Sequence, residues 1–558
     1  IQAADRVRLH KSIKYNEFMF EDLDNLINEQ LKNDLKVHVG QGFKWGPEHT
    51  GRVRELMRLS SDMSEIKLPF LVNLLMKDKS EETKNLGGHP YIHAVGHKCA
   101  YEDIMINAEN FKGHTMVFGQ VGTGKTTLLQ LLSTMALTRG NTCIVIDPKN
   151  DGQWRKALKY TAQKLDVPFY YFHPSQPSGD IVRIDAMGTY TKASEIASRL
   201  KSILPSGGSS DSFSNYAWAQ FNTVAEGILF VGEKPSLINM HNFLFNNRQK
   251  LVELVLEKYM ELNYGPNFKE TKRGDIERAG GESWLEQLMN HFKNVVVVVE
   301  TNDLIEKRYR RTVSNMINYI TSEDPARYNV MMSTTKPLIE QLVATPLDEL
   351  LSPVYAPDED DHRPIVTTKG VMETGGVLYI ALDSMSDSTV AGVTTKMLVS
   401  DICANAAERY NLGGKYSRLS LFVDEAHSAL NEPLVDLMAM GRAAEIEVYL
   451  SSQTLPDYYH KAGPEIAERL TGLIANMISL RVSDEKTQKL CVSRLGATRV
   501  RDIERKLSSG TSTDSSVADF STSFSETYKD TDNDMFPITL LGDLPKLQYI
   551  AHFADGSK

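Results

Sequence analysis

The feature that most constrains the fold of this chain is a glycine-rich segment, FGQVGTGKTTLLQ, at residues 118–130. It fits the pattern G-x-x-x-x-G-K-[ST], in which glycines let the backbone turn tightly and point its N–H groups at phosphate oxygens. An apolar run, HTMVFG, precedes the loop, and KTTLLQLLSTMAL continues it with apolar residues at helical spacing. The sequence therefore predicts a strand, a phosphate-binding loop and a helix whose positive N-terminus faces the phosphates.

The individual residues of this loop have expected roles. Lys125 would contact the β- and γ-phosphates, and the Thr126 hydroxyl would hold Mg²⁺. A glycine-rich turn without a ligand is the alternative, but it does not account for the strand and the helix on either side. The residues predicted to bind the nucleotide are Gly119, Gly122, Thr123, Gly124, Lys125, Thr126 and Thr127.

A second segment, LSLFVDEA at residues 419–426, completes the expected site. It is an apolar strand that ends in two adjacent carboxylates. Asp424 would bind Mg²⁺ through water, and Glu425 would act as the general base that polarises the attacking water. An acidic pair after a strand is a weak signal when it occurs alone. Together with the phosphate loop it predicts an NTPase that hydrolyses its nucleotide and does not transfer the phosphoryl group to a small acceptor.

The composition is that of a large globular protein. Of the 558 residues, 41% are hydrophobic and 24% are charged, which predicts a soluble protein of two or three domains. The net charge of −10 gives no global signal for nucleic acid, although a ring-shaped motor could confine basic residues to its channel. The four cysteines are scattered, so we expect a reducing, cytosolic setting without a disulfide or zinc framework.

No stretch approaches 18 consecutive apolar residues, so we expect no membrane span and no signal peptide within this sequence. The sequence begins with Ile1 and not with Met, and we expect residues upstream to have been removed. A membrane segment in the parent protein is compatible with both observations.

The order of the predicted elements indicates an α/β protein with a mainly parallel sheet. We predict a mostly helical N-terminal region at 1–86, a nucleotide-binding domain in two parts at 87–187 and 366–558, and an all-α domain inserted at 188–365. The expected strands are HTMVFG, NTCIVIDPK, VPFYYFHP, GGVLYIAL, SLFVDEA, EIEVYLSSQ, NMISLRVSD and LQYIAHFA.

Three segments are less clear. VGQGFKWG, at 39–46, is predicted to be a turn-rich link between two amphipathic helices. NVVVVVE, at 294–300, has the propensity of a strand but lies among helical segments, so we favour a helix. Residues 508–534 are rich in Ser, Thr and Asp, and we predict a mobile surface loop there.

Two further residues lie near the second strand of the expected site. Gln453 ends the strand VYLSSQ, where a polar residue would contact the γ-phosphate and sense its presence; the alternative is a Gln that caps the next helix. Arg442 precedes the same strand, and a neighbouring subunit could use it as an arginine finger; the alternative is a solvated surface Arg. Asp147 and Lys149, in DPKND, border the site, and we assign no chemical step to them.

Two other clusters contain residue types that occur in binding sites. Histidines recur every four residues in GGHPYIHAVGH, but Pro90 and the glycines argue against a helix there, so we do not predict a metal site from His89, His93 and His97. The segment EKRYRR could contact nucleic-acid phosphates, with a solvated helix face as the alternative. Its basic residues are Lys307, Arg308, Arg310 and Arg311.

The phosphate loop and the acidic pair lie about 300 residues apart, with a helical region between them, which sets this chain apart from small kinases and switch GTPases. In this organisation the chain resembles the coupling proteins of type IV secretion and bacterial conjugation, the TraD/TraG class, and in particular the branch carried by integrative conjugative elements and related plasmids. The resemblance covers about residues 37–500. It rests on VHVGQGFKWGPEHTGRV, LGGHPYIHAVG, GHTMVFGQVGTGKT, VIDPKNDG, YFHPSQPSGDIVRIDAMG, GGVLYIALDSM, LFVDEAHSAL, GRAAEIEVYLSSQTL and ISLRVSDEKT.

The resemblance implies a RecA- and FtsK-like P-loop ATPase that uses ATP and Mg²⁺. Such proteins are expected to form hexameric rings on the cytoplasmic side of the bacterial inner membrane, where they bind single-stranded DNA with its relaxase and pass both to the secretion channel. The family's transmembrane hairpin is missing from this sequence, which is then a soluble cytosolic portion. The residues that match the family's motifs are Lys125 and Thr126 as the clamp, Asp424 and Glu425 as metal and base residues, Gln453 as the sensor and Arg442 as the trans-acting arginine.

Two other functions remain open from the sequence. A FtsK/HerA-like translocase would prefer double-stranded DNA and would not bind a relaxase. A substrate-receptor scaffold would bind nucleotide without turnover, although the intact Asp424–Glu425 pair argues against it.

Overall fold

The computed structural model of the chain describes residues 22–54, 88, 92, 95, 101–175, 180–205, 210–296, 304–322, 324–355, 361–412, 417–441, 444–511 and 520–556. The chain folds into two compact units. The first unit comprises Ile1–Arg139, Glu447–Tyr458 and Thr471–Lys558, and the second comprises Gly140–Ile446 and Tyr459–Leu470.

The sheet of the first unit contains the strand that leads into the phosphate loop. The strand order is β14 (Ile550–His552), β11 (Asn476–Ser479), β3 (Thr115–Phe118) and β10 (Ile446–Ser452). β3 is parallel to both β11 and β10, whereas β14 runs antiparallel to β11. Every residue of β3, β10 and β11 is buried, as the apolar runs of the sequence predict.

The first half of the segment predicted as a turn-rich link, 39–42, belongs to a strand, so the prediction is wrong for these residues, whereas 43–46 form neither helix nor strand. β1 (Lys36–Gly42) pairs antiparallel with β2 (Glu102–Asn107), and Val37 and Val39 on β1 are buried. The register shifts between His38 and Gln41, where Gly40 has φ 129°. The glycines that suggested a turn therefore serve a bulge within a strand.

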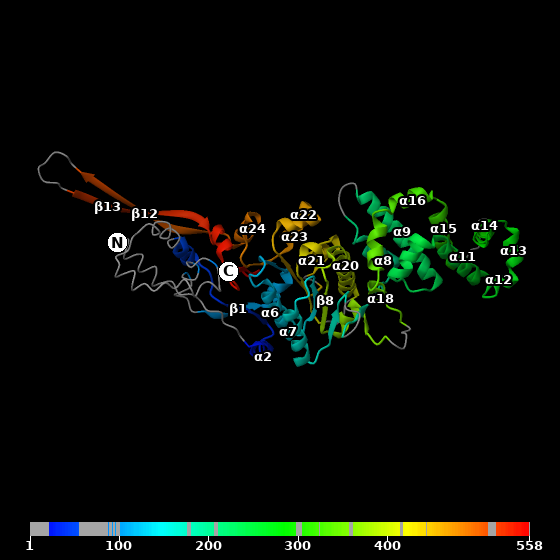
Figure 1. The fold of residues 1–558 in the computed structure, drawn as a ribbon, viewed down its shortest axis with the longest axis horizontal. Coiled ribbons are helices and arrows are strands. Elements are labelled where there is room, and N and C mark those ends of the chain that lie inside the picture. Colours follow the sequence, from blue (N-terminus) through cyan, green and yellow to red (C-terminus); the bar gives the residue numbers. More distant parts are fainter. Residues whose placement is uncertain are drawn as a thin grey trace. The chain divides into compact units, whose positions relative to one another are not determined.

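The described residues of the Ser- and Thr-rich segment, 508–511 and 520–534, are strands and not a loop, and residues 512–519 lie outside the described ranges. β12 (Ala497–Thr511) and β13 (Phe520–Asp534) form a long antiparallel pair (Figure 1). The register pairs Arg499 with Asp532, and their side chains form an ion pair at 3.0 Å, which stabilises strand pairing. Thr, Phe and Tyr within the segment also favour strands.

The sheet of the second unit carries the acidic pair. Its strand order is β9 (Leu419–Val423), β4 (Thr142–Asp147), β8 (Val377–Ala381) and β5 (Phe169–Phe172). All three strand pairings are parallel. The first three strands are fully buried, which explains why they read as continuous apolar runs.

Between Ala193 and Leu351 the described residues of the second unit form helices and no strand. α9, α11 and α15 pack together around buried apolar side chains (Figure 1). α14 extends through Val296, so the start of the valine run is helical, and its remaining residues lie outside the described ranges. The helices are α8 (Ala193–Lys201), α9 (Ser210–Val231), α10 (Leu237–His241), the π-helix η4 (Asn242–Asn246), α11 (Arg248–Tyr264), α12 (Phe268–Thr271), α13 (Arg273–Arg278), α14 (Trp284–Val296), α15 (Leu304–Thr321), α16 (Pro325–Met331), α17 (Thr335–Leu342) and α18 (Leu347–Leu351).

The remaining elements connect or cover the sheets. In the first unit they are α2 (Leu23–Leu31), η3 (Ala108–Gly113), α6 (Lys125–Thr138), α24 (Glu485–Leu495) and η6 (Ile538–Asp543). In the second unit they are α7 (Gly152–Lys164), β6 (Arg183–Ile184), β7 (Ile365–Val366), α19 (Thr368–Thr374), α20 (Ser388–Leu412), η5 (Ala426–Ser428) and α21 (Glu432–Met440). The helices α22 (Pro456–Ala462) and α23 (Pro464–Leu473) follow β10.

Candidate nucleotide site

The predicted phosphate loop joins the end of β3 to the start of α6. Residues 119–124 form the loop, between Phe118 and Lys125. Gly122 and Gly124 have φ 77° and 104°, in the left-handed region that side chains other than glycine rarely adopt. The glycine spacing of the sequence is thus explained by backbone conformation.

Close packing also requires glycine in this loop. A Cβ atom on Gly124 would lie 2.3 Å from Cδ2 of Leu547, whose backbone N–H donates to the Thr123 carbonyl at 2.8 Å. A Cβ atom on Gly119 would lie 3.0 Å from Oγ1 of Thr123. Leu547 lies more than 400 residues after the phosphate loop, and the sequence analysis did not predict that Leu547 contacts this loop.

The N-terminus of α6 is suited to a phosphate. No side chain caps the helix at Gly124, and its first residues carry the positive end of the helix dipole. Lys125 is buried, Thr126 is half-buried and Thr127 is exposed. A turn that only glycine can form, followed by an uncapped helix N-terminus, fits the triphosphate of a nucleotide.

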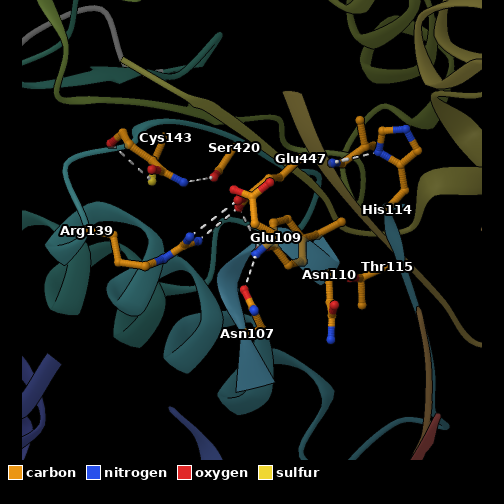
Figure 2. Close-up of polar contacts among 12 residues, drawn as sticks. Asn107, Glu109, Asn110, His114, Thr115, Arg139, Cys143, Ser420 and Glu447 are labelled. Carbon is orange, nitrogen blue, oxygen red and sulfur yellow. Dashed lines mark hydrogen bonds and ion pairs between the residues drawn. The ribbon is translucent and has the colours of Figure 1, made fainter. Parts of the chain in front are cut away.

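The opposite end of α6 is anchored by a buried ion pair (Figure 2). Arg139, which ends the helix, donates from Nη2 to Oε2 of Glu447 at 3.0 Å and from Nη1 to Oε1 at 3.4 Å. The Tyr449 hydroxyl also donates to Glu447, at 2.9 Å. Both charged side chains are almost fully buried, and they connect the phosphate-loop helix to β10.

Gln453 lies next to the phosphate loop. It follows β10, whose last residue, Ser452, faces Phe118 in the parallel register. The Gly119 N–H donates to the Ser452 carbonyl at 3.2 Å. Parallel strands end at the same edge of a sheet, so Gln453 and the loop share this edge, as a sensor of the γ-phosphate requires.

The acidic pair occupies the end of β9 in the second unit. The Asp424 N–H donates to the carbonyl of Ile146 on β4, at 3.0 Å. Both Asp424 and Glu425 are buried. Glu425 has φ 47° and ψ 47°, an uncommon conformation for a residue with a side chain, which is found where surrounding contacts impose it.

Lys149 contacts the predicted general base. Its Nζ forms an ion pair with Oε1 of Glu425. The backbone N–H of Lys149 donates to Oδ1 of Asp147 at 2.9 Å, and that carboxylate also accepts from the Asp151 N–H at 2.5 Å and the Tyr379 hydroxyl at 2.6 Å. Sequence reasoning placed Asp147 and Lys149 at the border of the site and missed this contact. The signal was the polar segment DPKND, which directly follows an apolar strand.

The buried position of this cluster changes the protonation of its groups. Desolvation raises the pKa of Asp147 above its ordinary value, opposed by the hydrogen bonds from Tyr379 and from two backbone amides. Desolvation lowers the pKa of Lys149, but the hydrogen bond and charge of Glu425 outweigh it, so the pKa lies above its usual range. Lys149 therefore carries its positive charge at neutral pH.

Some predicted residues lie outside the described ranges. They are Arg442 and the three histidines His89, His93 and His97. Among the described residues, no group of three or more His, Cys, Asp or Glu side chains is arranged to hold a metal ion. On α15, Tyr309 packs against Phe230 with ring centroids 5.3 Å apart, and Arg311 is exposed. Contact of this basic segment with nucleic acid stays a prediction.

Two protein-family models match the sequence. The type IV secretion-system coupling protein DNA-binding domain matches residues 99–263, and the TraM recognition site of TraD and TraG matches residues 418–546. The two ranges include the phosphate loop and the acidic pair, respectively. The chain belongs to the TraD/TraG class of type IV secretion coupling proteins.

The fold of this coupling protein is shared with solved structures. The plasmid coupling protein TrwB in complex with ADP and Mg²⁺ matches with a TM-score of 0.50 and 15% identity over 80% of this chain and 84% of that chain. TrwB in complex with a non-hydrolysable ATP analogue matches with a TM-score of 0.50 and 16% identity over 81% of this chain and 84% of that chain. These likenesses show the RecA-like NTPase fold with its helical domain, as predicted. No curated protein matches the sequence significantly.

Within the ranges that the structure describes, none of the helices of this coupling protein is long and apolar enough to span a membrane.

Proposed function

We propose that this coupling protein is an ATP-hydrolysing motor that recruits single-stranded DNA bound to a relaxase and drives it to a type IV secretion channel. The observation that carries the proposal is the phosphate loop, which has two glycines in left-handed conformations and opens onto the uncapped N-terminus of α6. This loop suits a nucleotide triphosphate, and the family to which the chain belongs couples DNA to secretion.

Each candidate residue has a proposed role in hydrolysis. Lys125 binds the β- and γ-phosphates, and Glu425 accepts a proton from the attacking water. Gln453 senses the γ-phosphate from the edge of the first unit's sheet. Arg442 is proposed as a finger that acts on the nucleotide of a neighbouring subunit. We also propose that the chain comprises an N-terminal region at 1–86, a nucleotide-binding domain at 87–187 and 366–558, and an inserted all-α domain at 188–365.

The hydroxyl of Thr126 and the carboxylate of Asp424 are the proposed Mg²⁺ ligands. Oxygen donors of these types are those that Mg²⁺ prefers. Bound Mg²⁺ would neutralise charge on the β- and γ-phosphates. The chain itself supplies the donors by placing the half-buried Thr126 in the first turn of α6 and Asp424 directly after β9.

The partners are proposed from the two family models. One is described as a DNA-binding domain and the other as a TraM recognition site, which supports DNA and relaxosome proteins as partners. Assembly as a hexamer on the cytoplasmic face of the bacterial inner membrane completes the proposal.

ATP hydrolysis by the chain, measured with and without single-stranded DNA over a range of protein concentrations, tests the motor function. We expect single strands to stimulate turnover, and the stimulation to rise with concentration because the arginine finger needs a neighbouring subunit. Lys125→Ala is expected to lose nucleotide binding, whereas Glu425→Gln is expected to bind ATP without hydrolysing it. Lys159→Met, on the exposed side of α7, is the matched control.

The same assay separates the alternatives. Stimulation by duplex DNA alone would favour a FtsK/HerA-like translocase. Tight ATP binding without turnover under any condition would favour a nucleotide-binding substrate receptor.

A further inference from the structure

The ion pair between Lys149 and Glu425 links two strand ends in the second unit. The parallel register pairs Ile146 on β4 with Val423 on β9, so the residues that follow each strand emerge side by side. The Glu425 side chain is only 10% exposed and that of Lys149 is 43% exposed. Water therefore reaches the lysine more readily than the carboxylate.

Lys149 is held in a rigid turn. Its own N–H and that of Asp151 donate to the two oxygens of the Asp147 carboxylate, and Asp151 caps α7 by accepting from the N–H groups of Gln153 and Trp154. The Tyr379 hydroxyl fixes the same Asp147 carboxylate from β8. The turn that carries the lysine is thus bound to three elements of the sheet and helix layer.

Glu425 is the more buried partner of the pair. Its backbone occupies the left-handed region, at the junction of β9 and the short helix η5, and the Ser428 N–H donates to its carbonyl at 2.9 Å. Its second carboxylate oxygen lies 3.7 Å from Nδ1 of His427. The carboxylate oxygen Oε1 that accepts from Lys149 Nζ is occupied by that contact, so it is not available to accept a hydrogen bond from a water molecule while the pair is closed.

We propose that Lys149 is a positioning residue that restrains Glu425 through their ion pair, so that the carboxylate acts on the attacking water only when the pair opens. The inference rests on the proposed function of Glu425 as the general base. In this proposal the ion pair slows ATP hydrolysis in the absence of DNA. Bound ATP is not hydrolysed while Glu425 stays paired with Lys149.

The test is a comparison of steady-state ATP hydrolysis by the wild-type chain, Lys149→Met and Lys149→Arg, all without DNA. Lys149→Met keeps the length of the side chain and removes its charge. An ion pair of this exposure shifts an equilibrium by up to about fivefold, so we expect kcat to rise about fivefold. KM for ATP is expected to stay within about twofold, since Lys149 does not contact nucleotide in the proposal. Lys149→Arg retains the pair and is expected to keep the low basal rate.

The outcomes separate the two proposals. A wild-type chain that hydrolyses ATP, together with a Lys149→Met variant whose kcat is equal or lower, would overturn the restraint and leave the ATPase intact. A silent wild type with an active Lys149→Met variant would support the restraint strongly. If neither protein hydrolyses ATP with or without single-stranded DNA, both proposals are overturned. Lys159→Met controls for the loss of a lysine from the same unit, and equal melting temperatures control for folding.

Discussion

Arg139 and Glu447 form a buried ion pair that ties the C-terminus of α6 to β10. The phosphate loop begins at the other end of this helix. β10 also leads into Gln453, the predicted sensor. One buried pair therefore sets the position of the phosphate loop relative to the strand that carries the sensor.

Removing one charge from this pair is expected to destabilise the first unit. In Glu447→Gln the Arg139 guanidinium stays buried without a carboxylate, which costs about 3–5 kcal/mol. Urea unfolding followed by circular dichroism measures the loss. Glu485→Gln, which removes the partner of Lys489 from an exposed pair on α24, is the control and is expected to leave stability unchanged. Equal midpoints for the two variants would contradict the structural role of the buried pair.

Gly124→Ala is expected to weaken nucleotide binding by about fivefold to about 150-fold. The residue has φ 104°, and the new Cβ atom would lie 2.3 Å from Cδ2 of Leu547, so the loop or that side chain must shift; the strain is about 1–3 kcal/mol. Titration with a fluorescent ATP analogue measures the affinity. Gly392→Ala, within α20 and with open space around its Cα, is expected to bind as the wild type does. Unchanged affinity in Gly124→Ala would argue against the loop geometry.

The helices between Ala193 and Leu351, which include His291 on α14, are expected to lose stability as the pH falls. Desolvation lowers the pKa of the buried His291 below 6.5, so the unfolded state binds a proton at a higher pH than the folded state does. The stability contributed by the neutral ring is therefore complete above pH 6.5 and is lost as the pH falls through the folded pKa. Melting temperatures at pH 7.5 and pH 5 measure this loss. His291→Gln is expected to show a smaller change with pH, and an unchanged dependence would contradict the assignment.

The register of the β12–β13 pair can be checked by crosslinking. Ser509 faces Thr522, so cysteines at these two positions are expected to form a disulfide under mild oxidation. Cysteines at Ser509 and Ser521 are offset by one residue, which places successive side chains on opposite faces, and are expected to remain reduced. Electrophoretic mobility without reductant measures disulfide formation in both double-cysteine variants. Equal crosslinking of the two variants would favour a mobile loop in place of the paired strands.

The parts of this protein that were predictable from the sequence depend on short segments. The phosphate loop needs glycine, lysine and threonine at fixed spacing, and each strand of the two sheets is an apolar run. These signals are local, so pattern and propensity were sufficient. Two local predictions missed strands. Gly40 marks a register shift within β1, and the Ser and Thr residues of 508–511 and 520–534 lie in paired strands.

Contacts between distant residues depended on the tertiary structure. Lys149 and Glu425 are 276 residues apart, and Arg139 and Glu447 are 308 apart. Each pair forms because strand order and register bring two chain segments together, and an apolar strand carries no information about its neighbour. The sequence supplied the phosphate loop and the acidic pair, whereas the lysine that holds the proposed base was revealed only where β4 and β9 lie side by side.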